Sequence, residues 1–295
     1  MKNKLENLEI LNKEMIELNN SREYDLGRKI IFILERLKKL KFLEIINAYR
    51  ISKLVCKTYN KNSQSNYHSN NSKKIVVYTC ITGNYDKILD PMYKKSNISY
   101  VLFTNNKNLK SDVWDIRDIP EKSKKLKDNI LINRYIKLKP HEIFENYDYS
   151  IYIDGNIRVI SDISEFVSTI NKKSGLSFHR HRARNCIYEE GKACVLMKKG
   201  NKQKIKEQLK KYKNIGFPKE FGLLEANVIV SDLHNKNSIK ILNDWYDEFI
   251  TSSSNRDQLS LPYVIWKNDL KISDIGNLGY NVRKNYYLQV KEHIK

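Results

Sequence analysis

The chain has 295 residues, of which 40% are hydrophobic, so it is long enough to bury a full-sized core and too apolar to be intrinsically disordered. Its net charge of +20 suggests an anionic partner, but residues 1–74 supply +8 of it (16 basic and 8 acidic residues) and the rest supplies +12. Basic charge is concentrated at residues 26–61 and thinly spread elsewhere, so we expect no nucleic-acid partner.

The four cysteines, Cys56, Cys80, Cys186 and Cys194, form neither a CxxC pair nor a zinc-type spacing with histidine. This pattern is typical of reduced thiols in a cytoplasmic protein. The charged N-terminus lacks the apolar core of a signal peptide, and its longest apolar run, residues 30–34, is too short to span a bilayer. We therefore expect a cytoplasmic location.

Residues 1–60 are predicted to form a helical extension. Within it, residues 26–59 combine one apolar stripe with a basic surplus, as in a helix that lies on the anionic inner face of the cell membrane. The alternative is a helix whose stripe packs on the rest of the protein or on a partner. Residues 61–73 are almost entirely polar and predict a linker, which leaves 74–295 as the main domain.

From residue 75 onward, strand patterns alternate with helical ones. Strands are predicted at 75–80, 100–104, 113–116, 147–153, 176–178 and 227–231, and helices at 122–138, 162–170, 202–212, 237–250 and 257–266. This order predicts an α/β sheet that is covered on both faces. Ligands of such sheets bind at the carboxyl ends of the strands, so the loops after residues 79 and 153 are candidate binding loops.

The stretch 147–160 contains Asp154, Gly155 and Asn156 between two apolar runs. Oxygen-bearing side chains at the end of a strand could hold Mg²⁺ or Mn²⁺, which prefer oxygen ligands and leave positions open for a substrate's phosphates. Asp-Gly between apolar runs is also typical of a tight β-hairpin. His234, beyond the strand at 227–231, is a further candidate metal ligand, although a lone histidine is more often structural.

Two clusters could bind a nucleotide. The first follows the strand at 75–80 and consists of Thr82, Gly83, Tyr85 and Asp86. A glycine lets the backbone approach a ligand, a tyrosine could stack on a base and an aspartate could bond a ribose, but a Gly-Asn turn after a strand is also commonplace. The second is Arg134 and Lys137, which share a helix face as in a phosphate clamp, or form a solvated basic face.

A basic loop, HRHRAR at 179–184, follows the strand at 176–178. It contributes three candidates for binding an anionic group, His179, Arg182 and Arg184, and a solvated surface loop is the alternative. Glu225 directly precedes an apolar strand, where a carboxylate must either be exposed to water or take part in a functional site. Asp257 opens a helix, a position that also suits a carboxylate for structural reasons.

No P-loop, GxSxG, HExxH or GxGxxG sequence is present, which removes the commonest ATPase, hydrolase, zinc-protease and dinucleotide-binding functions. Six segments, taken in order, resemble one family. They are YTCITGNYD (78–86), NRYIKLKPHEIF (133–144), YDYSIYIDGNIRV (147–159), HRHRARNCIYEE (179–190), FPKEFGLLEANVIV (217–230) and RDQLS (256–260). The family is the bacterial and plant glycosyltransferase-like domain of the TOD/MUCI type, long catalogued as a domain of unknown function.

The resemblance covers about residues 74–270 and implies a GT-A-like α/β fold, with a mixed, mostly parallel sheet flanked by helices. It implies transfer of a sugar from a nucleotide-sugar donor to a glycan or lipid-linked acceptor in bacterial surface polysaccharide (capsule or O-antigen) synthesis. Asp154-Gly155-Asn156 stands where many such enzymes have an Asp-any-Asp metal motif. The neutral Asn156 departs from that motif and leaves dependence on Mn²⁺ or Mg²⁺ open.

Under this resemblance, Glu225 and Asp257 are the candidate catalytic carboxylates. One of them would deprotonate the acceptor hydroxyl if the reaction inverts configuration, or stabilise the oxocarbenium-like sugar if it retains it. Two other functions stay open. One is a non-catalytic binder of anionic glycan or nucleic acid, suggested by the net charge, and the other is a metal-dependent hydrolase of a sugar or lipid phosphate. The oligomeric state stays open as well.

Overall fold

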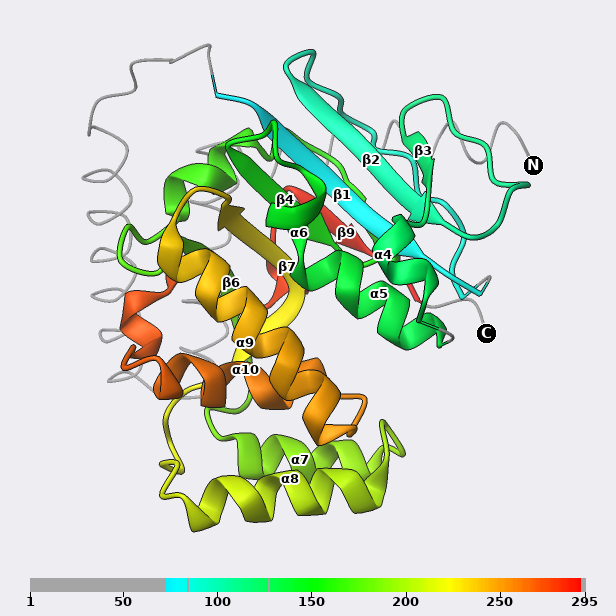
Figure 1. Ribbon diagram of the computed structural model, residues 1–295. Coiled ribbons are helices and arrows are strands. Elements are labelled where there is room, and N and C mark those ends of the chain that lie inside the picture. Colours follow the sequence, from blue (N-terminus) through cyan, green and yellow to red (C-terminus); the bar gives the residue numbers. More distant parts are fainter. Residues whose placement is uncertain (1–72, 84, 127, 293–295) are drawn as a thin grey trace, which may run out of the picture. The chain divides into compact units, whose positions relative to one another are not determined.

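The computed structural model describes residues 73–83, 85–126 and 128–292 (Figure 1). One compact unit comprises Ser72–Lys295. The helix predicted at 26–59 and nearly all of the predicted linker lie outside the described residues. Among the described residues, no helix has the length and apolar content that crossing a membrane requires.

A seven-stranded sheet forms the centre of this unit. Its strands are β1 (Ile75–Ile81), β2 (Ile98–Thr104), β3 (Asp115–Asp118), β4 (Tyr149–Ile153), β6 (Leu176–Arg180), β7 (Leu224–Asp232) and β8 (Gly276–Tyr280). They lie in the order β3-β2-β1-β4-β7-β6-β8, and all neighbours are parallel except β7, which is antiparallel to β4 and β6. The predicted mixed, mostly parallel α/β sheet is confirmed.

Helices lie on one side of this sheet (Figure 1). They are α4 (Glu121–Lys124), α5 (Asn129–Leu138), α6 (Pro140–Ile143), α7 (Ile187–Leu196), α8 (Lys202–Asn214), α9 (Lys236–Ser252) and α10 (Asp257–Lys267). Of these, α7 packs on α8 and α10, and α8 packs on α7 and α9. Buried side chains of α5 and of α7 to α10 form one apolar cluster with β1, β4, β6 and β7. The predicted helix at 122–138 is divided, because the Asp128 side chain accepts hydrogen bonds from Ile130 N (2.6 Å) and Leu131 N (3.3 Å) and starts α5 anew.

The other face has a different cover. It packs against a two-stranded sheet of β5 (Ile157–Val159) and β9 (Leu288–Val290) and against the short 3₁₀ helices η1 (Ser164–Thr169) and η3 (Val282–Lys284). A third 3₁₀ helix, η2 (Ile272–Asp274), precedes β8. The α-helix predicted at 162–170 is therefore the 3₁₀ helix η1, and no α-helix of the described residues joins this second cluster.

Asp154, Gly155 and Asn156 do not form a hairpin. The strand before them, β4, pairs with β1 and β7, whereas the strand after them, β5, pairs with β9. The turn therefore joins two sheets and lies where β4 ends. Because β1, β2, β4 and β6 run in one direction and β7 runs against them, the carboxyl ends of those four strands and the start of β7 share one edge of the sheet.

Candidate functional site

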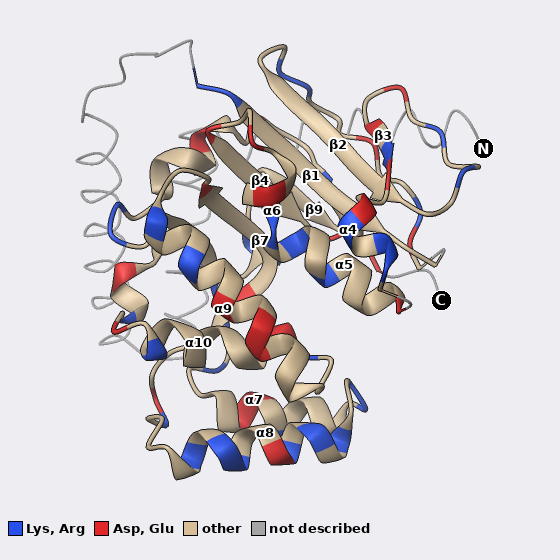
Figure 2. Ribbon diagram, in the orientation of Figure 1, with Lys and Arg blue, Asp and Glu red and all other residues tan. Residues whose placement is uncertain are grey.

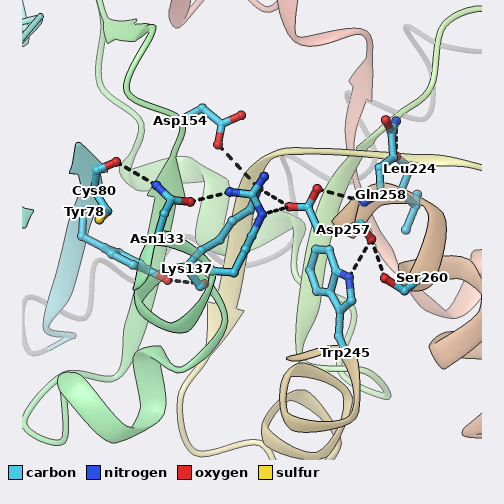
Figure 3. A network of polar contacts seen from close by, with 11 residues as sticks. Tyr78, Cys80, Asn133, Lys137, Asp154, Leu224, Trp245, Asp257, Gln258 and Ser260 are labelled. Carbon is cyan, nitrogen blue, oxygen red and sulfur yellow. Dashed lines mark hydrogen bonds and ion pairs between the residues drawn. The ribbon is translucent and has the colours of Figure 1, made fainter. Parts of the chain in front are cut away.

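A buried ion network lies at this edge. Lys137 Nζ is 2.8 Å from Asp257 Oδ2 and 3.5 Å from Asp154 Oδ1 (Figure 3). Arg134 Nε is 3.0 Å from the same Asp257 oxygen. The side chains of Lys137 and Asp257 are 2% and 6% exposed, whereas that of Asp154 is 33% exposed. The network therefore runs from the core to the surface, and Asp154 is its accessible end.

Asp257 is an ionised carboxylate in this network. Burial alone would favour its neutral form, but Arg134 and Lys137 hold its pKa well below the usual range of an aspartate. Burial likewise opposes the charge of Arg134, but the Asp257 carboxylate, together with Tyr152, Asp154 and Cys80, more than offsets burial and raises the pKa of that guanidinium. A buried carboxylate that is paired with two cations is a poor proton acceptor. These surroundings favour a positioning role for Asp257 over the predicted role as a catalytic base, and its part in catalysis stays a prediction.

Neutral hydrogen bonds fix the backbone around the network. The Tyr78 hydroxyl donates to the Lys137 carbonyl oxygen (2.9 Å). Trp245 Nε1 and Ser260 Oγ donate to the Asp257 carbonyl oxygen, at 2.8 Å and 3.0 Å (Figure 3). Neither Tyr78 nor Trp245 was singled out from the sequence, because a buried aromatic residue with one hydrogen bond looks like ordinary core there. Their bonds leave Lys137 and Asp257 little freedom to move.

The loop after β1 is tied to the start of α5 by asparagines. Thr82 Oγ1 donates to the Asn129 carbonyl oxygen (3.1 Å), and Gly83 N donates to Asn105 Oδ1 (3.1 Å). Gly83 has a φ of +62°, in the left-handed region that favours glycine, and a Cβ there would lie 2.7 Å from Asn129 Nδ2 and displace that side chain. Thr82 is buried and shapes the loop. The sequence pattern missed Asn105, although it directly follows β2 at the same edge.

Asp86, in this same loop, lies beside the turn after β4. A Cβ built on Gly155 would be 3.4 Å from Asp86 Oδ2, so the carboxylate stands against the Asp154-Gly155 peptide. Tyr85, two residues after Gly83 in this loop, is exposed. The structure thus brings the loop after β1 and the turn after β4 together, with two carboxylates between them.

His234 does not join these carboxylates. Its Nε2 is 3.3 Å from Asp148 Oδ1, and Asp148 directly precedes β4, six residues before Asp154. At the rise of an extended strand this separation is roughly 20 Å, so His234 lies at the opposite edge of the sheet. The structure therefore does not bring His234 and Asp154 together, as the predicted metal site would require. His234 was expected near Asp154 because the antiparallel direction of β7 relative to β4 could not be predicted from the sequence.

The oxygen-bearing side chains at this turn are candidate ligands for a cation that is shared with a substrate. Asp154 and Asp86 supply carboxylates, and Asn156 is held at the turn because its Nδ2 donates to the Lys291 carbonyl oxygen (2.9 Å). In residues 73–292, apart from 84 and 127, no group of three or more His, Cys, Asp or Glu side chains is placed to hold a metal ion. This set suits Mg²⁺ or Mn²⁺, which bind through one or two carboxylates together with substrate phosphates.

Glu225 lies at the start of β7, at the same edge. Its Oε2 accepts a hydrogen bond from Val282 N (2.8 Å). Burial raises the pKa of its carboxyl, although the Val282 amide, Asn227 and Arg182 partly oppose this effect. Two residues further along, the Asn227 carbonyl oxygen accepts from Asp154 N (2.9 Å), which links the start of β7 to the turn after β4. Glu225 is therefore a half-buried carboxylate that can take up a proton, in contrast to Asp257.

The basic loop after β6 divides into residues with different surroundings. His179 is fully buried, and its Nε2 accepts a hydrogen bond from Asn285 Nδ2 (2.8 Å), so the structure places this residue in the core rather than at the surface where a donor was predicted to contact it. Arg184 Nε lies 2.5 Å from Glu190 Oε2 on α7 and anchors the loop there. Arg182 is exposed and interacts electrostatically with Glu225. Of the three predicted residues, Arg182 has the surroundings that suit ligand binding best.

The buried His179 makes stability depend on pH. Burial lowers its pKa from 6.5 to about 4, so the folded state holds it neutral where the unfolded chain would be protonated. We expect the free energy of unfolding to fall by up to about 3 kcal/mol as the pH is lowered from 6.5 towards 4. Urea unfolding at several pH values measures this. His179→Gln should flatten the dependence and the exposed His234→Gln should not, and equal slopes in wild type and His179→Gln would contradict the assignment.

Comparisons with known proteins extend this description. Residues 52–285 match the model of the "TOD1/MUCI70, glycosyltransferase-like domain". A search of curated proteins gives no match. Two similar solved structures are a "WbbM bifunctional glycosytransferase apo structure" and a galactosyltransferase LgtC "in complex with donor and acceptor sugar analogs", each 14% identical. The WbbM structure has a TM-score of 0.42, and the similarity covers 70% of this chain and 39% of the WbbM chain. The LgtC structure has a TM-score of 0.40, and the similarity covers 71% of this chain and 74% of the LgtC chain. The chain thus spans well under half of the WbbM chain.

A mostly parallel α/β sheet with charged side chains gathered at its carboxyl edge defines a protein that binds its ligand at that edge. The family match covers well over half of the chain. The chain therefore belongs to the TOD1/MUCI70 glycosyltransferase-like domain family, and the resemblance inferred from its motifs is confirmed. The protein is a glycosyltransferase-like enzyme.

Proposed function

We propose that the protein transfers a sugar from a nucleotide-sugar donor to a glycan or lipid-linked acceptor. Its pathway would be the synthesis of a bacterial surface polysaccharide such as capsule or O-antigen. The observation that carries the proposal is Asp154, the accessible end of the buried network, which lies at the carboxyl edge of the sheet beside Asp86. The family match supports the transferase reaction.

The roles of the residues follow from their surroundings. Asp257 holds Lys137 and Arg134 in place, and Lys137 in turn holds Asp154 at the surface. The exposed Tyr85 and the loop after β1 would contact the nucleotide, and Glu225 would act on the acceptor hydroxyl or on the sugar, according to the stereochemistry. Arg182 would add positive charge on the acceptor side of Glu225.

Asp154 and Asp86, with the amide oxygen of Asn156, would hold Mg²⁺ or Mn²⁺. Such a cation supplies charge neutralisation for a diphosphate leaving group. The Lys137 ammonium also lies beside Asp154, because its Nζ is 3.5 Å from Asp154 Oδ1. The Lys137 ammonium keeps the Asp154 carboxylate oriented with or without a metal ion, and this arrangement offsets part of the weakening that the neutral Asn156 brings.

The test is the donor affinity of Asp154→Asn. We expect this substitution to remove most nucleotide-sugar binding in the presence of Mn²⁺, since it takes away the one network carboxylate that a donor can reach. Isothermal calorimetry with UDP-, GDP-, CMP- and TDP-linked sugars, with and without Mn²⁺, identifies the donor and then measures the loss. Asp148→Asn, at the opposite edge of the sheet, is the matched control.

Unchanged affinity of Asp154→Asn for the identified donor would refute the proposed site. Binding of nucleotide-free sugar phosphates as tight as that of nucleotide sugars would favour the hydrolase instead. A location at the cytoplasmic face of the membrane through residues 26–59 stays a prediction of this proposal, and it concerns residues outside the described part.

A further inference from the structure

The turn between α7 and α8 holds two neighbouring apolar side chains in water. Leu196 is 82% exposed, the largest fraction among the large hydrophobic residues that the structure describes, and Met197 is 50% exposed. Single exposed hydrophobic residues are normal on protein surfaces. Two adjacent ones at the end of a helix form a small apolar tip, and water contact with this tip is unfavourable.

Backbone hydrogen bonds close this turn and keep it ordered. Met197 N donates to the Ala193 carbonyl oxygen (2.9 Å), and Lys199 N donates to that of Cys194 (2.8 Å). The bond from Lys199 closes the helix end in the manner of a Schellman motif, with Lys198 in the left-handed region at a φ of +54°. A lysine at that position is less favourable than a glycine. The turn thus presents Leu196 and Met197 outward from a fixed backbone.

The surroundings of the tip are strongly basic. Residues 192–213 include nine lysines and a single acidic residue, Glu207. Figure 2 shows this charge along α8. Four exposed lysines flank the apolar pair most closely in sequence, namely Lys192, Lys198, Lys199 and Lys202. An exposed apolar pair that is flanked by exposed lysines is typical of surfaces that enter the headgroup region of an anionic bilayer.

The tip is joined to the segment that leads into the ion network. Asn201 N donates to the Ser254 carbonyl oxygen (3.0 Å). A Cβ on Gly200 would lie 2.6 Å from the same oxygen and 2.7 Å from Arg256 Cγ. Arg256 directly precedes Asp257, which pairs with Lys137 and Arg134. A membrane that is bound at the tip would therefore lie near the helix start that positions the candidate site.

We propose that the α7–α8 turn docks the protein on an anionic lipid bilayer. Leu196 and Met197 enter the boundary between headgroups and acyl chains, and the flanking lysines contact lipid phosphates. This surface is formed by residues other than 26–59. Its use rests on the proposed function, because a lipid-linked acceptor would then be presented beside the site. The combination of apolar exposure and positive charge favours a bilayer over an acidic protein, for which lysines alone would suffice.

The test is vesicle binding by the full-length protein. Co-sedimentation with phosphatidylcholine vesicles that contain phosphatidylglycerol should show binding, and pure phosphatidylcholine vesicles should bind far less. The double substitution Leu196→Ser and Met197→Ser should lower the partition coefficient about tenfold. Replacing Lys198 and Lys199 by glutamate should also lower the partition coefficient, and the reduction should be larger at low salt than at high salt. Ile215→Ser is the matched control, since Ile215 is 47% exposed just beyond the other end of α8.

Residues 26–59 are the same in all variants, so differences between variants report on the turn. Equal partitioning of the wild type and the Leu196→Ser/Met197→Ser variant would overturn the inference, as would equal binding to neutral and anionic vesicles. No binding of the wild type at low salt would overturn it as well. Donor affinity, measured by calorimetry without vesicles, should be the same in wild type and the variant. Absence of donor binding in the wild type would refute the proposed function while leaving the vesicle result to stand on its own.

Discussion

Asp257→Asn is expected to lower the free energy of unfolding by about 3–5 kcal/mol. The substitution leaves the Lys137 ammonium and the Arg134 guanidinium, both inside the protein, without the carboxylate that compensates them at 2.8 Å and 3.0 Å. The more accessible Asp154 is 3.5 Å from Lys137 and replaces little of that interaction. Urea unfolding followed by tryptophan fluorescence measures the change, because Trp245 donates a hydrogen bond to the Asp257 backbone.

Glu121→Gln is the control, since it removes an exposed carboxylate that pairs with Lys124 and should leave unfolding unchanged. Asp257 has a lowered pKa, so its contribution is complete above the ordinary aspartate pKa of about 3.9 and is lost only as the pH falls below that value. The stability difference between wild type and Asp257→Asn should therefore persist at pH 5, where the His179 effect is already visible. If the Asp257→Asn variant is as stable as the wild type but has lost turnover, the result would instead support a catalytic role for Asp257.

Glu225→Gln is expected to cut turnover by at least about a hundredfold while it largely keeps donor affinity. The amide retains an acceptor for Val282 N but cannot take a proton or carry the negative charge. Burial raises the pKa of Glu225, so the rate of the wild type should fall as the pH is lowered through a value above 4.5. The variant should lack this acid limb. Steady-state kinetics with the identified donor, combined with calorimetry, separates turnover from binding.

Glu220→Gln is the matched control for this experiment, because Glu220 is an exposed carboxylate in the segment just before β7. Its rates should equal those of the wild type. A Glu225→Gln variant with a wild-type rate would exclude the residue from the chemical step. Parallel losses of turnover and donor affinity would show that Glu225 positions the donor.

The sequence predicts six of the seven strands of the central sheet, because most of them are short apolar runs with clear ends, and it does not predict β8. β1 is buried at all seven positions, and the strand expected at 75–80 differs from it by one residue. The sequence patterns did not predict elements whose formation depends on tertiary contacts. α7 begins directly after the basic loop, without a side-chain cap, and was not predicted. β9 is only three residues long and forms a sheet with β5, a partner more than 120 residues earlier.

The site shows the same division. The position of Asp154 after a strand was sufficient to predict its place at the carboxyl edge, because strand direction follows from alternating strands and helices. The network behind it was not predictable, since Lys137 and Asp257 are 120 residues apart and nothing local indicates that they pair. His234 was misplaced because only the reversed direction of β7 decides at which edge it lies.

β7 enters the sheet between β4 and β6, two strands that precede it by more than 40 residues. Neither β4 nor β6 has its full set of backbone partners until residues 224–232 arrive, and contacts between distant segments form late in folding because closing long loops costs entropy. The bond from Asp154 to Asn227 and the place of Glu225 both depend on this step. A chain that has not inserted β7 would thus lack part of the proposed donor site even where its helices have formed. Donor binding would then report on completion of the fold and draw the last folding equilibrium towards the native state.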